Sequence, residues 1–311
     1  MNASLADGRT NEAGRVYLID ASVYVFRAWF SLPDTMVDGD GQPINAVHGF
    51  ARFLLDLRRR VERGSVLALA FDESLTSCFR NAIYPPYKAN RPPVPEDLKR
   101  QFARCRSLCT ALNLTTHADA QYEADDIIGH WTREARELGV PVTVVSRDKD
   151  LTQLVAADVD WWDFAGNVRL NADGVRQKMG VNPAQVADYL ALTGDAVDNI
   201  PGVKGVGPKA AVALLARFVD LDALYRDIDA VPSLPVRGAA ALQRRLVEGE
   251  ASARLSRRLT GVQSTCPGTP RLPTMGLPGA RLRHPAALES EGLGDTITAL
   301  LRTAFGHPGH N

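Results

Sequence analysis

The sequence predicts an α/β fold, in which a central, mainly parallel sheet is followed by a smaller helical region. Three short apolar runs, at residues 16–19, 66–71 and 140–146, are hydrophobic almost without interruption, which is typical of strands buried on both faces. Helical patterns lie between these runs, and such alternation favours parallel pairing of the strands. From about residue 172 the pattern is helical only. A chain of 311 residues is long enough to bury a sizeable core in both parts.

The N-terminal half begins with a polar leader. Residues 1–14 lack the apolar segment of a signal peptide, and we expect them to be disordered. The first strand ends at Asp20. Residues 42–63 have an apolar stripe at helical spacing, which predicts a helix that ends at Gly64. The second strand ends at Asp72.

A basic segment follows at residues 78–106, with seven basic residues against two acidic ones. Its prolines predict an irregular excursion rather than a long helix. A solvated surface is the default interpretation. Because the segment directly follows Asp72, however, Lys88 and Arg91 are expected to stand over the acidic edge of the sheet and attract a phosphate. Tyr84 and Tyr87 either stack on unpaired bases or pack locally.

Three carboxylates, Glu123, Asp125 and Asp126, begin the next helix. Acidic residues in a first turn are favoured by the helix dipole alone. Three together repel one another, which local propensity does not require. Residues two apart do not share a helix face, so we place Glu123 in the turn before the helix. The third strand is then followed by Asp148 and Asp150.

The carboxyl ends of parallel strands meet at one edge of a sheet, and ligands bind there. Seven carboxylates are therefore expected to gather at this edge: Asp20, Asp72, Glu123, Asp125, Asp126, Asp148 and Asp150. Such crowding is costly unless a cation binds. Oxygen ligands without histidine or cysteine suit Mg²⁺ or Mn²⁺, and this number suits two ions, an arrangement that serves attack on phosphorus.

The helical region contains a glycine-rich turn. A helix that begins near residue 182 ends around Asp195 and Asp198, which either belong to the helix end or reach the metal site. The turn that follows consists of Gly202, Val203, Lys204, Gly205, Val206 and Gly207. It is either a plain helical hairpin or a site where backbone N–H groups approach phosphates. Lys204 and Lys209 favour a nucleic-acid backbone.

Bulk properties exclude little. Basic and acidic residues balance at 36 each, so only local patches can attract nucleic acid. The four cysteines show no metal-type pairs, which fits a reducing cytoplasm. No apolar run approaches the length of a membrane span. After about residue 264, proline and glycine accumulate and helical periodicity fades.

Several long motifs together resemble the bacterial and phage 5′-3′ exonuclease and flap endonuclease family, and most of all the N-terminal nuclease domain of DNA polymerase I. They are, in order, VYLIDASVYVFRAWF, LAFD, YPPYKANRPP, YEADDIIG, SRDKDLTQLV and LTGDAVDNIPGVKGVGPKAA, over about residues 15–262. The resemblance implies a PIN-like domain at 15–172 with a helical arch at 74–110. It further implies a helix-three-turn-helix (helix-hairpin-helix-like) region at 173–262, which leaves a Pro/Gly-rich tail at 263–311.

The resemblance also implies roles for individual residues. It places the first metal on Asp20, Asp72, Glu123 and Asp125. It places the second on Asp126, Asp148, Asp150, Asp195 and Asp198. Lys88 and Arg91 match cations at the base of the arch, and Arg27 matches a further arginine on the phosphate side. The turn 202–207 matches a duplex-binding hairpin that in relatives holds a monovalent ion, often K⁺.

These expectations describe a structure-specific 5′ nuclease that uses two Mg²⁺ or Mn²⁺ ions. Its expected partners are DNA with a 5′ flap, nick or single-strand/double-strand junction, and RNA primer strands, bound by a cytoplasmic monomer. No polymerase segment follows, so we expect a stand-alone nuclease. Three alternatives remain open: a non-catalytic binder of DNA structure, a PIN-type ribonuclease, and an aspartyl-phosphate enzyme using Asp20. An aspartyl-phosphate enzyme would be expected to have a second aspartate two residues after Asp20, where this sequence has Ser22.

Overall fold

The computed structural model describes residues 14–62, 64–73, 78–272, 288 and 292–306. Its centre is a six-stranded sheet in the order β3-β2-β1-β4-β5-β6. The strands are β1 (Val16–Asp20), β2 (Val66–Asp72), β3 (Thr115–Asp119), β4 (Val142–Val145), β5 (Val159–Asp163) and β6 (Val168–Leu170). All neighbours pair in parallel except β5 and β6. Because the strand order reverses between β1 and β4, the ends of these strands form the crevice where ligands bind in such sheets.

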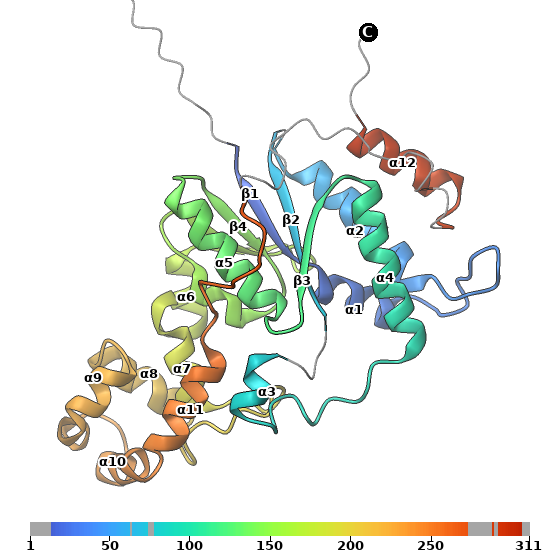
Figure 1. The fold of residues 1–311 in the computed structure, drawn as a ribbon. Coiled ribbons are helices and arrows are strands. Elements are labelled where there is room, and N and C mark those ends of the chain that lie inside the picture. The colour runs from blue at the N-terminus through green and yellow to red at the C-terminus, as the bar shows by residue number, and fades with distance from the viewer. Residues whose placement is uncertain (1–13, 63, 74–77, 273–287, 289–291, 307–311) are drawn as a thin grey trace, which may run out of the picture.

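Helices cover both faces of the sheet, and the alternation of side chains along β1 shows why (Figure 1). Val16 and Leu18 belong to the core on the side of α5 (Ala124–Glu137). Tyr17 and Ile19 point to the opposite face and pack with the second core. That second face is covered by α1 (Ala21–Ser31), α2 (Asn45–Arg60), α4 (Glu96–Ala111) and α12 (Asp295–Phe305).

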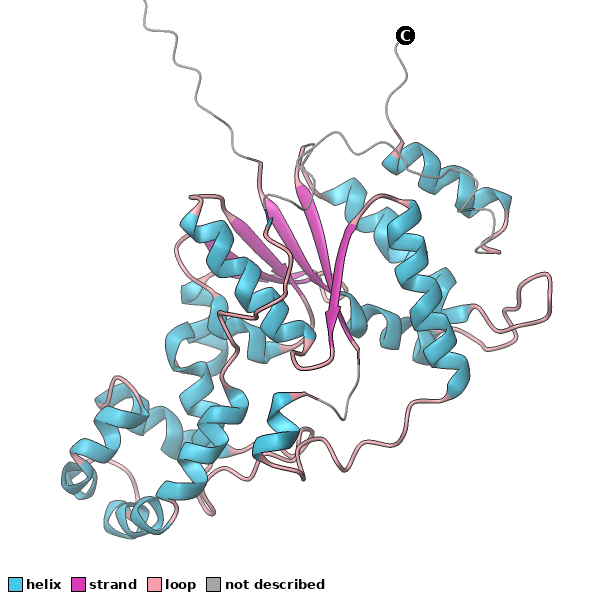
Figure 2. Cartoon of the chain, in the orientation of Figure 1, coloured by secondary structure: helices cyan, strands magenta, loops and turns pink. Residues whose placement is uncertain are grey.

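A helical region lies beside the sheet, at the lower left of Figure 2. It contains α6 (Ala172–Met179), α7 (Val186–Thr193), α8 (Pro208–Arg217), α9 (Leu221–Arg226), α10 (Ala239–Glu248) and α11 (Glu250–Thr260). Short three-ten turns lie at η1 (Lys149–Leu154), η2 (Pro183–Gln185) and η3 (Ile228–Ser233). The apolar side chains of the helical region are continuous with the core beneath α5. The helical region and the sheet therefore share one hydrophobic cluster.

The basic segment contains more helix than we expected. Besides the short α3 (Phe79–Ile83), it includes the 16-residue helix α4, so the prediction of an irregular excursion is wrong for its second half. The prolines explain the difference, because all of them precede α4 and Pro95 is its N-cap. Strands β3, β5 and β6 were also not predicted. Polar residues such as His117 and Asp160 interrupt their apolar pattern.

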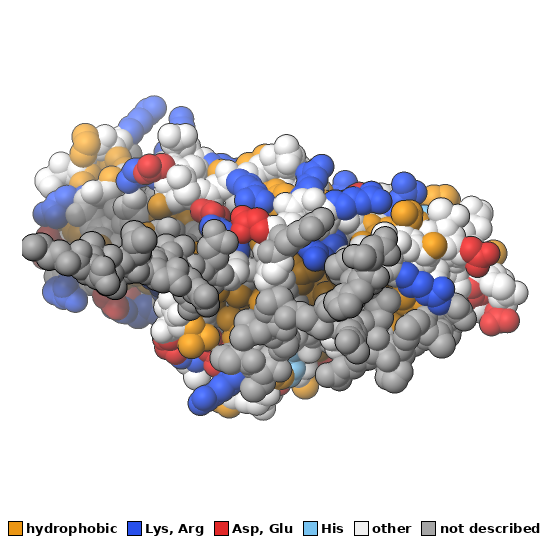
Figure 3. Space-filling model, turned by 90° about the horizontal axis from the view of Figure 1, so that it is seen from above, with side chains coloured by type: hydrophobic (Ala, Val, Ile, Leu, Met, Phe, Trp, Pro, Cys, Tyr) orange, Lys and Arg blue, Asp and Glu red, His pale blue; other side chains and the backbone are white. Residues whose placement is uncertain are grey.

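The tail contains a helix as well. Within it, α12 packs against α2, and Leu301 is completely buried there. The expected disordered leader lies outside the described residues except for Gly14, as do residues 273–287, 289–291 and 307–311. In the described part of the chain, every helix is too short or too polar to cross a bilayer. Seen from above, basic side chains are scattered among neutral and acidic ones (Figure 3).

Candidate active site

The aspartates at the strand ends are tied together by hydrogen bonds. Asp20 is the N-cap of α1 and accepts a hydrogen bond from the Val23 N–H at 3.3 Å. Its other carboxylate oxygen accepts from the Ser146 hydroxyl at 2.9 Å, which joins the ends of β1 and β4. Asp72 accepts from the Ala124 N–H at 2.9 Å, which brings the start of α5 to the end of β2.

Burial and mutual repulsion raise the pKa values of Asp20 and Asp125. Burial, and then the charges of Asp72 and Asp148, raise the pKa of Asp20 to about 7. The pKa of Asp125 is raised well above its ordinary value by burial and by the charges of Asp148 and Asp20. Charges from three strand ends and from α5 therefore act on one another within one site.

The same repulsion reaches the second group of predicted ligands. Burial, and then Asp148 and Asp195, raise the pKa of Asp150 to about 8. Burial also raises the pKa of Asp148, and Asp198 adds to the effect. The predicted convergence of Asp195 and Asp198 on this edge thus agrees with the electrostatics, although both come from the loop after α7.

The donor set fits a hard divalent cation. It consists of carboxylate oxygens, and one of them, Asp150 Oδ1, is buried without a hydrogen-bond partner. Among the residues that the structure describes, no three His, Cys, Asp or Glu side chains already surround one metal position. The assignment of individual ligands therefore stays a prediction.

Glu123 and Asp126 differ from the other carboxylates because both pair with Arg80. Glu123 is the N-cap of α5, as expected, and forms a capping box with Asp126. Although burial acts in the opposite direction, Lys88 and Arg80 keep the pKa of Glu123 below its ordinary value. Both oxygens of Asp126 accept hydrogen bonds from Arg80, at 2.6 and 2.7 Å. Arg80 thus engages both oxygens of Asp126, and the expected role of Asp126 as a direct metal ligand stays a prediction.

Lys88 is held over the site by an unusual backbone. Its φ is 55°, a conformation that side chains with a Cβ rarely adopt. The Lys88 N–H donates to the Asp198 carbonyl at 3.0 Å, and the Asn199 side chain donates to the Pro86 carbonyl at 2.7 Å. The Lys88 ammonium pairs with Glu123, and Arg91 pairs with Asp198. The predicted cations therefore do lie beside the acidic residues.

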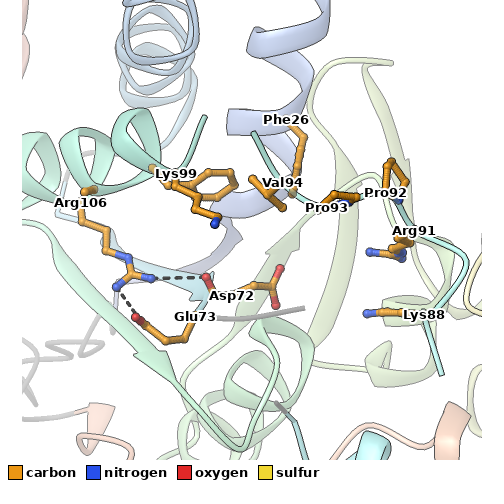
Figure 4. A pocket seen from close by; sticks show the side chains of 12 residues that line it. Phe26, Asp72, Glu73, Lys88, Arg91, Pro92, Pro93, Val94, Lys99 and Arg106 are labelled. Atoms are coloured by element: carbon orange, nitrogen blue, oxygen red, sulfur yellow. Dashed lines mark hydrogen bonds and ion pairs between the residues drawn. The ribbon is translucent and has the colours of Figure 1, made fainter. Parts of the chain in front are cut away.

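A cavity of about 590 Å³ opens next to this group. In Figure 4, Lys88 and Arg91 extend from one side toward the Asp72 carboxylate. Phe26 and Val94 line the upper part of the cavity in this view, and the predicted Arg27 is exposed one residue further along α1. Arg106 closes the far side by binding Glu73 at 2.6 Å.

The two tyrosines do not behave alike. Tyr87 is only 4% exposed, and its hydroxyl donates to Glu123 at 2.9 Å. Its ring packs against Cys78, Ile200 and Leu259, which favours the alternative of local packing over stacking on bases. Tyr84 is half-buried at the edge of the same cluster, and its role stays a prediction.

The glycine-rich turn joins α7 to α8 and is fastened to α11. The Gly202 N–H donates to the Ser256 hydroxyl at 3.0 Å, and the Ser252 hydroxyl donates to the Gly202 carbonyl at 2.6 Å. The side chains of Val203 and Val206 are buried in the core, so only their backbone could meet DNA. Lys204 and Lys209 are exposed, as a phosphate-binding role requires.

The sequence reasoning missed two residues of the site. The sequence pattern assigns Ser146 only to a strand and Arg80 only to the basic segment. A serine at the end of a strand that precedes Asp148 was a weak signal for Ser146. Nothing near Arg80 in the sequence indicates that it is buried, because its partners are more than 40 residues away.

Comparison with known proteins agrees with the motifs. Residues 15–180 match the family described as 5′-3′ exonuclease, N-terminal resolvase-like domain, and residues 181–280 match 5′-3′ exonuclease, C-terminal SAM fold. DNA polymerase I of Pseudomonas aeruginosa is 40% identical over 248 residues, which are 79% of this chain and 27% of the polymerase. The chain thus spans about a quarter of the polymerases that it matches.

Shorter relatives are matched over most of their length. The 5′-3′ exonuclease of Aquifex aeolicus is 35% identical over 68% of this chain and 72% of the relative. The 5′-3′ exonuclease of Buchnera aphidicola is 29% identical over 81% and 87%, respectively.

Solved structures share the fold. The T5 5′-exonuclease with bound zinc has a TM-score of 0.62 and 18% identity, over 94% of this chain and 98% of that one. The catalytic core of Rad2 with a DNA substrate has a TM-score of 0.58 and 15% identity, over 94% and 92%. The family matches and the identity to the Aquifex exonuclease show that this chain belongs to the 5′-3′ exonuclease family.

Proposed function

We propose that the chain is a divalent-metal-dependent 5′ nuclease, acting as a 5′-3′ exonuclease and a 5′ flap endonuclease on DNA. The observation that carries this proposal is the group of mutually repelling carboxylates at the ends of β1, β2 and β4, with Lys88 and Arg91 beside it. Neither an acidic cluster nor a pair of cations alone would indicate phosphodiester hydrolysis.

In this proposal two Mg²⁺ or Mn²⁺ ions bind at the strand ends. Asp20, Asp72, Glu123 and Asp125 would hold one, and Asp148, Asp150, Asp195 and Asp198 the other. When bound, such ions supply an activated water and stabilise charge on the attacking and leaving oxygens. The carboxylates of this chain position the ions, and Ser146 orients Asp20 by its hydrogen bond.

Lys88 and Arg91 attract the phosphate that the carboxylates alone would repel. Glu123 and Asp198 keep these cations in place until the substrate arrives. The turn 202–207 and Lys209 bind the duplex backbone further along. A K⁺ ion that used the Gly205 carbonyl would compete with the Arg245 guanidinium, which donates to this carbonyl at 3.3 Å.

We propose DNA with a 5′ flap, nick or single-strand/double-strand junction as the substrate, and RNA primer strands as a further one. In support, a T5 flap endonuclease with this fold was solved with DNA and metal ions, and the Rad2 core with a DNA substrate. We further propose that the protein acts as a monomer in the cytoplasm, which suits its four buried free cysteines.

The test is cleavage of labelled flap, nicked, single-stranded and RNA substrates, with and without Mg²⁺. We expect metal-dependent products from the flap and nicked DNA that are lost in Asp20→Ala and Asp148→Asn. Asp56→Asn, which alters an exposed carboxylate on α2, is the matched control. Full activity in both site variants would reject the metal assignment. Binding without products would favour a non-catalytic binder, and preference for RNA would favour a ribonuclease.

A further inference from the structure

Arg80 is a buried arginine whose five N–H donors all have acceptors. It is 3% exposed. Its Nε donates to the Leu259 carbonyl at 2.8 Å. One terminal nitrogen donates to Glu123 at 2.8 Å and to Asp126 at 2.6 Å. The other donates to Asp126 at 2.7 Å and to the Gly261 carbonyl at 3.2 Å.

Asp126 is equally saturated. Besides the two bonds from Arg80, it accepts from the Gln263 N–H at 2.9 Å and from the Glu123 N–H at 3.2 Å. A carboxylate offers about four acceptor positions. With 0% exposure and four hydrogen bonds, Asp126 has no free position for a metal ion.

The pair lies where three parts of the molecule meet. In Figure 1, α3, which carries Arg80, lies below the sheet and beside α11. Asp126 belongs to the first turn of α5. Leu259 lies near the end of α11, the helix whose Ser256 also binds the backbone of Gly202 in the glycine-rich turn.

The pair also controls the position of Glu123. One Glu123 oxygen accepts from Arg80 and from the Tyr87 hydroxyl, and the other pairs with Lys88. The capping box between Glu123 and Asp126 orients the first turn of α5. Asp125, another predicted metal ligand, belongs to the same turn. If Arg80 were removed, Glu123 would lose a hydrogen bond that fixes its side chain. Lys88 would then pair with a carboxylate whose position is no longer fixed.

We propose that Arg80 and Asp126 form a positioning pair that sets Glu123 and Lys88 for metal and phosphate binding, and that Asp126 is not a metal ligand. This inference rests on the proposed nuclease function. A positioning role differs from a purely structural one in its consequence. Removing the pair should weaken metal binding and catalysis even in a variant whose stability is preserved.

The decisive variant is the double change Arg80→Met/Asp126→Leu, which replaces a buried ion pair by apolar side chains of similar volume. Such replacements often preserve stability, whereas removal of one partner does not. Asp150→Asn is the matched control for loss of a ligand. Arg80→Lys keeps the charge but cannot supply five donors, and it takes the place of the double variant if that does not fold.

Four quantities are measured for each protein: the number of bound Mn²⁺ ions and their affinity by electron paramagnetic resonance, kcat on flap DNA, and the DNA Kd in Ca²⁺. We expect the double variant to bind as many ions as the wild type. Its Mn²⁺ affinity and kcat should fall about tenfold to a hundredfold, as is usual when partners of metal ligands are changed. The DNA Kd should stay nearly constant.

Two results would overturn the proposal. Loss of one ion, as expected for Asp150→Asn, would make Asp126 a ligand. Wild-type kcat and Mn²⁺ affinity in the folded double variant would make the pair merely structural. Failure of the wild type itself to bind Mn²⁺ or to cleave DNA would instead remove the proposed function, so the two failures are distinguishable.

Discussion

Lys88 combines a strained backbone with a buried charge. The left-handed conformation at φ 55° is maintained by hydrogen bonds from its own N–H to Asp198 and from Asn199 to Pro86. Strain of this kind persists only where the surroundings determine it, and it concentrates at functional sites. The side chain is 10% exposed and pairs with Glu123. The structure therefore fixes the ammonium group before any substrate binds.

We expect Lys88→Ala to reduce kcat more than affinity. A preorganised positive group acts chiefly where charge develops in the transition state, and losing one donor of this kind costs about a hundredfold to a thousandfold in kcat. Single-turnover cleavage of flap DNA, with the Kd measured in Ca²⁺, tests this. Lys99→Ala is the control, because Lys99 lines the same cavity but is exposed. Equal losses of rate and affinity would contradict the assigned role.

His130 links pH to stability away from the acidic site. It is 7% exposed, and its Nδ1 accepts a hydrogen bond from the Cys266 N–H at 3.1 Å. Burial lowers the pKa of His130, although Glu134 opposes the shift. The unfolded chain therefore binds a proton more readily than the folded one. This contribution to stability is present above about pH 6.5, the unperturbed pKa, and is lost as pH falls through the folded pKa.

We predict that His130→Asn reduces the loss of stability on acidification. Asparagine keeps an acceptor for Cys266 but does not titrate. The wild-type free energy of unfolding should fall further between pH 7 and pH 5, by ~1.4 kcal/mol for each unit of pKa depression. Urea titrations at several pH values measure the difference. His48 and His117, whose pKa values are also lowered, remain in both proteins and cancel. Parallel pH profiles would refute the prediction.

At the scale of elements, the glycine-rich turn depends on one backbone position. Gly202 has a φ of 62°, and a Cβ there would lie 2.3 Å from the Gly194 nitrogen. Both the conformation and the close approach of two backbone segments require glycine. Gly207, the N-cap of α8, has a φ of −99° and open space where a Cβ would be.

We expect Gly202→Ala to destabilise the protein by more than about 1 kcal/mol in urea unfolding, because the residue is incompatible with both backbone and space. Gly207→Ala should cost less than this, because the backbone and the space at Gly207 accept a Cβ and only the weaker N-cap preference of alanine is left. If the turn binds phosphates through its backbone, Gly207→Ala should still weaken duplex binding, since a methyl group would block the approach. Equal stabilities of the two variants would show that the turn is not constrained as described.

Helix α12 offers two adjacent leucines for a direct comparison. Leu301 is completely buried, whereas Leu300 is 39% exposed. Leu301→Ala should lower the free energy of unfolding by about 2–5 kcal/mol, the usual cost of such a core truncation. Leu300→Ala should have little effect in the same thermal or urea measurement. If both variants unfold like the wild type, α12 contributes nothing to the core.

The whole molecule carries no net charge, yet it is expected to bind a polyanion. Basic and acidic residues balance at 36 each, so any affinity for DNA depends on where the cations lie. The exposed Lys204 and Lys209 belong to the helical region, whereas Lys88 and Arg91 belong to the acidic site. A duplex bound at the turn would extend from one part to the other.

We therefore predict that the affinity for DNA falls with salt concentration, and that the steepness of this dependence reflects the phosphate contacts of Lys204 and Lys209. Each phosphate contact adds about −0.9 to the slope of log K against log salt. The double variant Lys204→Ala/Lys209→Ala should reduce the slope by about two. Arg52→Ala/Arg59→Ala removes two exposed charges from α2 on the other side of the sheet and should not change it. Fluorescence anisotropy in Ca²⁺ at several KCl concentrations measures both, and equal slopes would contradict the proposed duplex site.

Much of the fold could be predicted because its main strands are continuous apolar runs. The strands ending at Asp20 and Asp72 and the helix beginning after Glu123 lie where the sequence pattern indicated. Strand β3 could not be predicted, since an edge strand with His117 and Asp119 is half-exposed and shows no apolar run. Helix α4 was obscured by prolines that only precede it.

The sequence by itself determined the chemistry at the edge of the sheet. Parallel strands that end in aspartate must present those carboxylates together, so residue type and strand pattern suffice. Only the tertiary structure decided which carboxylates remain unpaired. Asp126 is neutralised by Arg80, 46 residues away, whereas Asp150 keeps a buried oxygen without a partner. The reason is that such pairing depends on side-chain direction and burial across distant segments, neither of which a local pattern encodes.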